Sequence, residues 1–166
     1  MEEVLRVSGI THDEKVCEVS ILGIPDHPGM AYSVFAKLDD HNILVDSIIQ
    51  SIRRQQVNDI SFTVNTEDLQ ETVDIMKELA EEIGAEKVVY YESVAKISVI
   101  GAGMVNKSKV ARAMFQALSE ENINIRMINS SEIRLSCIID GQDIERAINS
   151  IHDKFYINGI EVTTKE

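Results

Sequence analysis

Residues 23–31 have the sequence Gly-Ile-Pro-Asp-His-Pro-Gly-Met-Ala and join a predicted β-strand, residues 16–22, to a predicted helix, residues 30–41. The first N–H groups of a helix have no partner within it, and the positive end of the helix dipole lies behind them. Pro28 suits a first helical turn, and Gly29 lets a ligand approach the backbone closely. The segment therefore predicts a site for a small carboxylate or phosphate.

The same nine residues also fit a purely structural role. Asp26 would then cap the helix while Pro28 and Gly29 form a turn, with no ligand bound. Both hypotheses stay open on this segment alone, because short motifs often occur by chance.

The composition indicates a globular protein that contacts neither nucleic acid nor a membrane. Hydrophobic residues make up 44% of the chain, and no apolar run approaches the roughly 18 residues of a membrane span. Sixteen basic residues against 28 acidic ones give a net charge of −12, which opposes binding to nucleic acid or anionic lipid. The acidic start, residues 1–3, lacks the basic and apolar regions of a secretory signal, so we expect a cytoplasmic location.

The cysteines and histidines show no pattern of a metal or catalytic site. Cys17 and Cys137 lie in separate apolar runs without CxxC spacing, which predicts buried free thiols. The four histidines have no metal-ligand spacing, and no nucleophile–base pair can be assembled. We therefore expect no metal, no cofactor and no catalytic residue on this chain.

A pattern of strands and helices occurs twice along the chain. Four residues of the first half match residues 80 positions further on. These are Phe35, Asn42, Ile43 and Ile48, which match Phe115, Asn122, Ile123 and Ile128. The first copy comprises strands over residues 16–24, 45–52, 57–65 and 87–91 with helices over 30–41 and 67–83. The second comprises strands over 94–101, 124–129, 132–139 and 159–163 with helices over 105–121 and 142–155.

Two copies of β-α-β-β-α-β predict an α+β fold of two ferredoxin-like repeats, each an antiparallel sheet with helices on one face. We assign residues 16–91 to the first domain, and residues 1–15 with 92–166 to the second. A further strand over residues 4–10 would pair with the second domain, after a turn near His12. Within the first domain, Thr66 is expected to cap a helix and Gly84 to end it.

Four segments together resemble the tandem ACT-domain regulatory region of aspartokinase, and the resemblance runs over nearly the whole chain. They are Gly-Ile-Pro-Asp-His-Pro-Gly at 23–29, Asn-Ile-Leu-Val-Asp-Ser-Ile-Ile-Gln at 42–50, Val-Ile-Gly-Ala-Gly-Met at 99–104 and Ile-Asn-Ser-Ser-Glu-Ile-Arg-Leu-Ser at 128–136. The resemblance implies a chain that senses lysine and/or threonine and controls ATP-dependent phosphorylation of aspartate by a kinase domain. No kinase opening motif occurs here, so the chain is either a small regulatory subunit or a part of the whole enzyme.

The resemblance also implies an effector pocket between the first repeat of one chain and the second repeat of its partner in a homodimer. The matching positions are Asp26, Gly29, Met30, Ala31 and Gln50 in the first repeat, and Asn124, Ile125 and Ser131 in the second. We expect helix-start N–H groups to bind the effector's carboxylate, Asp26 or backbone carbonyls to bind its ammonium, and Gln50 and Asn124 to complete the hydrogen bonds. The expected partners are the amino-acid effector, a second copy and an aspartate kinase catalytic domain or subunit.

Some features leave alternatives open. Residues 104–110 depart from the Ser-His-Pro-Gly-Val-like turn of the family, and Asn129 stands where relatives tend to have serine. A second effector site and the choice between lysine and threonine therefore stay open. A stand-alone ACT amino-acid sensor for another enzyme or a transcription regulator, and a small enzyme on a ferredoxin-like fold, are the rival functions.

Overall fold

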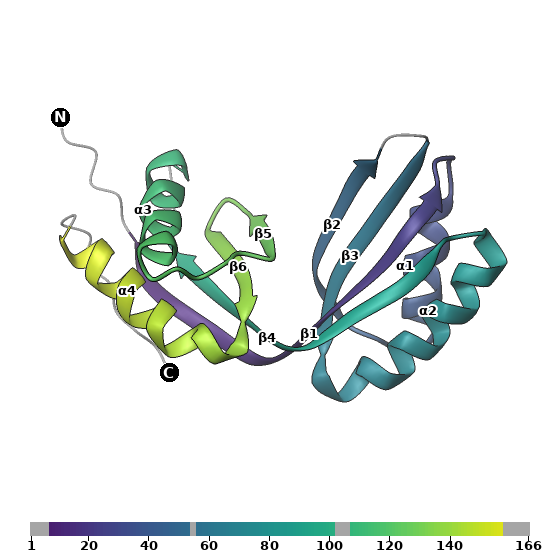
Figure 1. Cartoon of the computed structure of the whole chain (residues 1–166), viewed down its shortest axis with the longest axis horizontal. Coiled ribbons are helices and arrows are strands. Elements are labelled where there is room, and N and C mark those ends of the chain that lie inside the picture. Colours follow the sequence, from purple (N-terminus) through teal and green to yellow (C-terminus); the bar gives the residue numbers. More distant parts are fainter. Residues whose placement is uncertain (1–6, 54–55, 102–106, 158–166) are drawn as a thin grey trace. The chain divides into compact units, whose positions relative to one another are not determined.

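The computed structural model describes residues 7–53, 56–101 and 107–157. The chain forms two compact units, Lys15–Glu92 and Met1–Glu14 with Ser93–Glu166. Two long strands, β1 (Gly9–Pro25) and β4 (Lys87–Ile100), run through both units and contribute one part of their length to each (Figure 1).

The unit Lys15–Glu92 is a four-stranded sheet covered by two helices. Its strand order is β2-β3-β1-β4, with antiparallel pairs between β2 (Val45–Arg53) and β3 (Val57–Asn65) and between β3 and β1. The helices α1 (Met30–Asp40) and α2 (Leu69–Ile83) pack on the sheet face that carries every second residue of β3, including Ile60, Phe62 and Val64. Phe62 is fully buried and meets Phe35 of α1 edge to face, with ring centroids 6.1 Å apart.

The other unit repeats this arrangement. Its strand order is β1-β4-β6-β5, where β5 (Met127–Ser130) and β6 (Arg134–Asp140) form an antiparallel hairpin and β6 pairs with β4. The helices α3 (Lys107–Glu120) and α4 (Ile144–Ile157) supply the rest of its core, which includes Met114, Leu118, Ile151 and Phe155. The predicted α+β fold of two repeats, with antiparallel sheets and helices, is confirmed.

The first helix of each repeat ends in the same way. Asn42 and Asn122 both adopt the left-handed conformation, with φ values of 56° and 55°. The N–H of Ile43 donates to the carbonyl of Leu38 at 3.0 Å, and the equivalent bond in the second repeat measures 2.9 Å. This pattern is a Schellman ending, in which asparagine tolerates the positive φ. Asn42 and Asn122 thus end equivalent helices.

Two expected breaks between strands are wrong. No turn forms near His12, because β1 continues without a break from Gly9 to Pro25. The strands expected over residues 87–91 and 94–101 are likewise one strand, β4. At the expected breaks, His12, Glu14 and Lys15 of β1 and Glu92 and Ser93 of β4 are solvent-exposed in extended backbone, so their composition resembles that of a turn.

The start of α2 also differs from the prediction. Thr66 begins a short 3-10 turn, Thr66–Asp68, and the residue that precedes α2 is Asp68, which makes no side-chain cap. The Thr66 hydroxyl oxygen instead accepts a weak hydrogen bond from Sγ of Cys17 at 3.8 Å. Gly84 ends the helix as expected, with φ +74° and its N–H donating to Ala80. The strand expected over residues 159–163 and the helix start at residue 105 lie outside the described residues.

The two cysteines are free and buried, as predicted. Burial raises the pKa of Cys17 and raises the pKa of Cys137 to about 12. None of the helices in the described ranges has the length and apolar character needed to cross a membrane.

Candidate functional site

A β-bulge in β1 prepares the turn that leads into α1. The register of β1 against β3 shifts between Ile21 and Ile24, and Gly23 within the bulge has φ +68°. The N–H of Gly23 donates to a carboxylate oxygen of Asp59 at 2.8 Å. Residues three apart in a regular strand lie on opposite faces, but the extra residue of the bulge keeps both Ile21 and Ile24 in the core. The bulge thus determines which side chains reach the end of the sheet beside α1.

A cavity of about 330 Å³ lies where β1, the following turn and the start of α1 meet β2 and β3. All five residues predicted from the first repeat line it, namely Asp26, Gly29, Met30, Ala31 and Gln50. Ile24 and Ile60 are its buried apolar members, and they also belong to the core of the unit. The structure therefore brings the first-repeat part of the predicted site together around one cavity.

The start of α1 offers backbone donors to this cavity. The first backbone hydrogen bond of the helix runs from the N–H of Ser33 to the carbonyl of Gly29 at 2.9 Å, so the N–H groups of residues 30–32 precede the helical ladder. Gly29 has φ +98°, and a Cβ at this position would have nothing within 4 Å. The first turn contains no acidic residue. The arrangement suits a carboxylate or phosphate group.

The prediction that Asp26 caps α1 is wrong. Gly29 precedes the first helical residue, and no side chain caps the helix. Asp26 lies three positions too early in the chain to cap it. Its carboxylate oxygen Oδ1 instead accepts a hydrogen bond from Nδ2 of Asn58 at 2.8 Å, while its N–H donates to the carbonyl of Gln56 at 2.9 Å. Asp26 therefore lines the cavity as a carboxylate held by a neighbouring strand.

Asn58 is a residue of this cavity that the sequence analysis missed. Its side chain is only 6% exposed, and its carbonyl oxygen Oδ1 is buried without a hydrogen-bond partner among the described residues. The alternation of β3 places Asn58 on the same face as Ile60 and Phe62, which both belong to the core. A polar residue that continues a buried row is the signal from which the sequence could have singled it out.

The three second-repeat residues lie in the other unit. Asn124 is exposed and Ile125 is half-buried against the core of that unit, both in the segment between α3 and β5. Ser131 is exposed in the turn between β5 and β6, where its N–H donates to the carbonyl of Arg134 at 2.8 Å. Their meeting with the first-repeat residues of a partner chain stays a prediction.

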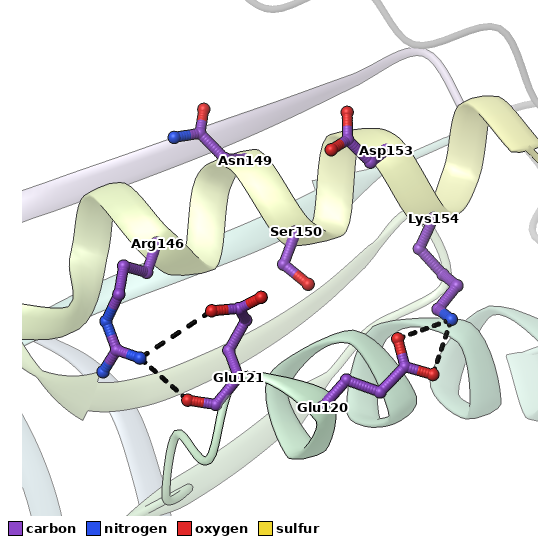
Figure 2. Close-up of a pocket in the computed structure, with 7 residues that line it drawn as sticks. All are labelled: Glu120, Glu121, Arg146, Asn149, Ser150, Asp153 and Lys154. Atoms are coloured by element: carbon purple, nitrogen blue, oxygen red, sulfur yellow. Dashed lines mark hydrogen bonds and ion pairs between the residues drawn. The ribbon is translucent and has the colours of Figure 1, made fainter.

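A second cavity, of about 370 Å³, lies between α3 and α4 (Figure 2). Four of its charged side chains form pairs between α4 and the end of α3, while Asp153 lies 3.8 Å from His152 of its own helix. Nζ of Lys154 lies 2.8 Å from both carboxylate oxygens of Glu120, which holds the pKa of that carboxyl below its usual range. Nη1 of Arg146 donates to the main-chain carbonyl of Glu121 at 2.8 Å and lies 3.8 Å from its carboxylate.

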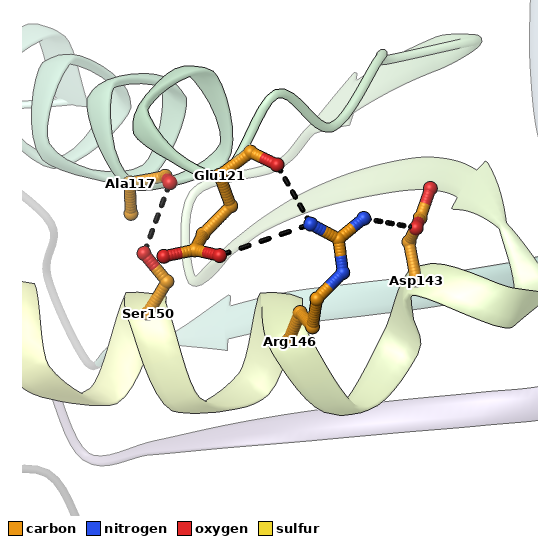
Figure 3. Close-up of polar contacts among 5 residues, drawn as sticks. All are labelled: Ala117, Glu121, Asp143, Arg146 and Ser150. Atoms are coloured by element: carbon orange, nitrogen blue, oxygen red, sulfur yellow. Dashed lines mark hydrogen bonds and ion pairs between the residues drawn. The ribbon is translucent and has the colours of Figure 1, made fainter.

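Figure 3 shows that this network continues around Arg146. Nη2 of Arg146 donates to Oδ1 of Asp143, and the hydroxyl of Ser150 donates to the carbonyl of Ala117 at 2.9 Å. These contacts link the end of α3 to α4. Because four of its five charged lining residues already pair with one another, we interpret this cavity as part of a helix–helix contact, and the cavity beside α1 as the candidate site.

Within the described part of the chain, no group of three or more His, Cys, Asp or Glu side chains could hold a metal ion. The residues of the cavity beside α1 offer an arrangement for a small organic ion instead. Backbone donors lie at the helix start, and the carboxylate of Asp26 and the amide of Gln50 carry acceptors among the lining residues.

Comparisons with known proteins agree on one family. Models of the ACT domain match residues 19–84 and residues 97–155. The chain is 34% identical over 160 residues to an aspartate kinase from Stutzerimonas stutzeri, in an alignment that covers 96% of this chain and 39% of that protein. The chain thus spans about two fifths of the length of the curated relatives it matches.

Solved structures show the same similarity over whole chains. A structure of aspartokinase alpha and beta subunits has a TM-score of 0.84 and 39% sequence identity, covering 90% of this chain and 99% of that one. The regulatory subunit of aspartate kinase from Thermus thermophilus has a TM-score of 0.84 and 35% identity, covering 90% and 98%.

Proposed function

This chain belongs to the aspartokinase family as a regulatory region of two ACT domains, and we propose that it binds lysine and/or threonine as feedback effector. Binding would control the phosphorylation of L-aspartate by a catalytic domain or subunit. The observation that carries the proposal is the cavity beside α1, which gathers Asp26, Gly29, Met30, Ala31 and Gln50 at the start of a helix.

The chemistry of this cavity suits a free amino acid. The N–H groups of residues 30–32 would bind the carboxylate, helped by the helix dipole. Asp26 keeps one carboxylate oxygen that no hydrogen bond to Asn58 occupies, and this oxygen would accept from the ammonium. Gln50 would donate or accept one more hydrogen bond. The volume of about 330 Å³ falls at the small end of the range for ligand pockets, about 300–1,000 Å³.

The proposal includes a partner chain. We place Asn124, Ile125 and Ser131 of a second copy over the cavity, in a homodimer whose sheets align into eight-stranded layers. Exposed apolar side chains support an interface on the edge strands of both units: Ile48 and Ile52 are 51% and 82% exposed on β2, and Ile128 is 46% exposed on β5.

Control of the kinase would follow from a shift between two arrangements. An effector that binds one arrangement more tightly than the other changes their populations by its difference in binding free energy. We place this regulation in the cytoplasm, where the buried thiols of Cys17 and Cys137 would stay reduced.

A thermal-shift screen of the full chain against the twenty amino acids tests the proposal. A ligand at a hundred times its Kd stabilises the folded state by about 2.7 kcal/mol, which corresponds to roughly 5–10 °C for a chain of this size. We expect lysine or threonine to produce such a shift. No shift with any amino acid would refute the proposal, and a shift without an effect on a co-expressed aspartate kinase would favour the stand-alone sensor.

A further inference from the structure

We propose that Asn58 is an effector-binding residue that selects ligands with a primary ammonium group. In this role its amide N–H group holds the carboxylate of Asp26, and its carbonyl oxygen accepts a hydrogen bond from the ammonium. The inference rests on the proposed function and adds to it the residue and the chemical group that decide selectivity.

The orientation of the amide follows from its contact with Asp26. Nδ2 lies 2.8 Å from Oδ1 of Asp26, and an ionised carboxylate can only accept hydrogen bonds. The NH₂ end of Asn58 must therefore face Asp26, which leaves Oδ1 of Asn58 as the free end. This oxygen is buried and accepts no hydrogen bond from any described residue. Since it is shielded from solvent, water cannot replace the missing donor, and such a buried acceptor costs free energy.

The position of Asn58 in the sheet connects this oxygen with the cavity. Asn58 is paired with Ile24 of β1 and Ile52 of β2, on the face of β3 that also carries Ile60. Both Asn58 and Ile60 line the cavity beside α1. An apolar residue at position 58 would fill this buried row of β3 without the free-energy cost of burying an unpaired amide oxygen. The amide therefore indicates that a polar group is needed for function at this end of the sheet.

The number of acceptors matches an ammonium group. A primary ammonium has three N–H donors. Three residues that line the cavity carry side-chain acceptors, namely Asp26 with its second carboxylate oxygen, Gln50 with Oε1, and Asn58 with Oδ1, which is buried in this structure. Because Oδ1 is buried in this structure, its contact with the ligand requires the amide to rotate, and Asp26 can follow the amide because it lies on an exposed turn. A 2-hydroxy acid has a single donor in this place and would leave acceptors unpaired.

Calorimetry at pH 7 on the full chain tests this role with two ligand pairs: L-threonine and L-lysine, each against the analogue in which a hydroxyl replaces the α-ammonium. Asn58→Leu keeps the approximate shape and removes both polar groups. We expect it to weaken amino-acid binding by about ten- to a hundredfold and analogue binding by less than about threefold. The control is Gln70→Leu, which removes another amide–carboxylate contact, to Asp74 on the surface of α2, and should leave binding unchanged.

Asn58→Asp provides a second variant that keeps an acceptor in this place. Two carboxylates so close share a proton at first and both ionise as the pH rises, so amino-acid affinity should increase with pH in this variant more than in the parent chain. If Asn58→Leu does not fold, the pH dependence of amino-acid affinity in Asn58→Asp tests the proposal instead. The same pH dependence in this variant and in the parent chain would refute the role of Asn58.

The outcomes separate this inference from the proposed function. Equal losses for the amino acid and its analogue, or unchanged amino-acid affinity in Asn58→Leu, would refute the selective role of Asn58 while the pocket itself stands. If the parent chain binds none of the twenty amino acids, the proposed function fails, and this inference fails with it.

Discussion

Replacing Asp26 by alanine should affect effector binding more than folding. The stability cost arises at Asn58, because its amide N–H loses the acceptor at 2.8 Å and the side chain is only 6% exposed. A buried donor without a partner costs about 1–3 kcal/mol. The Asp26 side chain is itself exposed, so its removal loses little buried area. We therefore expect the free energy of unfolding to fall by about 1–3 kcal/mol.

The binding cost of Asp26→Ala should be larger. Removing one member of a hydrogen-bonded charge pair within a complex costs about 2–5 kcal/mol, because the other charge stays without its partner. This range corresponds to a factor of about thirty to several thousand in Kd. The matched variant Asp26→Asn keeps an acceptor for Asn58 and removes the charge, so it should recover most of the stability while binding stays weak.

Urea unfolding and calorimetry with L-lysine and L-threonine measure the two costs on the same preparations. An unchanged effector affinity in Asp26→Ala would refute the assignment of Asp26 to the site. A loss of stability below about 0.5 kcal/mol in that variant would refute the argument from the buried amide of Asn58.

Other predictions concern the fold that supports the site. Gly23→Ala should lower the free energy of unfolding by more than Gly84→Ala does. Both positions have positive φ, which costs about 1–3 kcal/mol, but only at Gly23 would the new Cβ come within 2.2 Å of Cγ of Glu86. Equal losses of stability in urea unfolding would contradict this prediction. Phe62→Ala should lower the free energy of unfolding by about 3–5 kcal/mol, since the ring is fully buried. A loss near 1 kcal/mol would show that the core collapses into the space left by the ring. Burial raises the pKa of Cys137 from 9.0 to about 12, so the stability that depends on its protonated thiol is complete below pH 9. Between pH 9 and 12 the free energy of unfolding should decrease by about 1.4 kcal/mol per pH unit. The variant Cys137→Ala should lack this part of the decrease in denaturation measurements, and the same pH dependence in both proteins would contradict the pKa shift.

The sequence predicts the repeat because each copy carries its own local signals. Asn42 and Asn122 end equivalent helices with the same hydrogen bonds, and Gly84 ends α2 through its positive φ. The turn expected near His12 was wrong because polarity alone cannot distinguish a turn from a solvated stretch of a long strand. Thr66 failed as a cap because a 3-10 turn separates it from α2.

The site residues likewise include some that local sequence predicts and others that depend on contacts between distant parts of the chain. An anion site at the helix start near Gly29 was predicted from local chemistry, and the resemblance to the family added Asp26 and Met30; all three line the cavity. Asn58 was missed because its contact with Asp26 depends on the register of β1 against β3, which the bulge at Gly23 shifts. No local pattern encodes that shift. Asn124 is expected to act on a partner chain, so no contact within one chain can test its role.

The measurement that tests the central claim most directly is isothermal titration calorimetry of the full chain with L-lysine and with L-threonine. We predict saturable binding of at least one of them, at about one equivalent per chain, with an affinity that Asp26→Ala lowers by a factor of about thirty or more. Absence of binding by both amino acids, or binding with the same affinity in Asp26→Ala, would contradict an effector site at the start of α1.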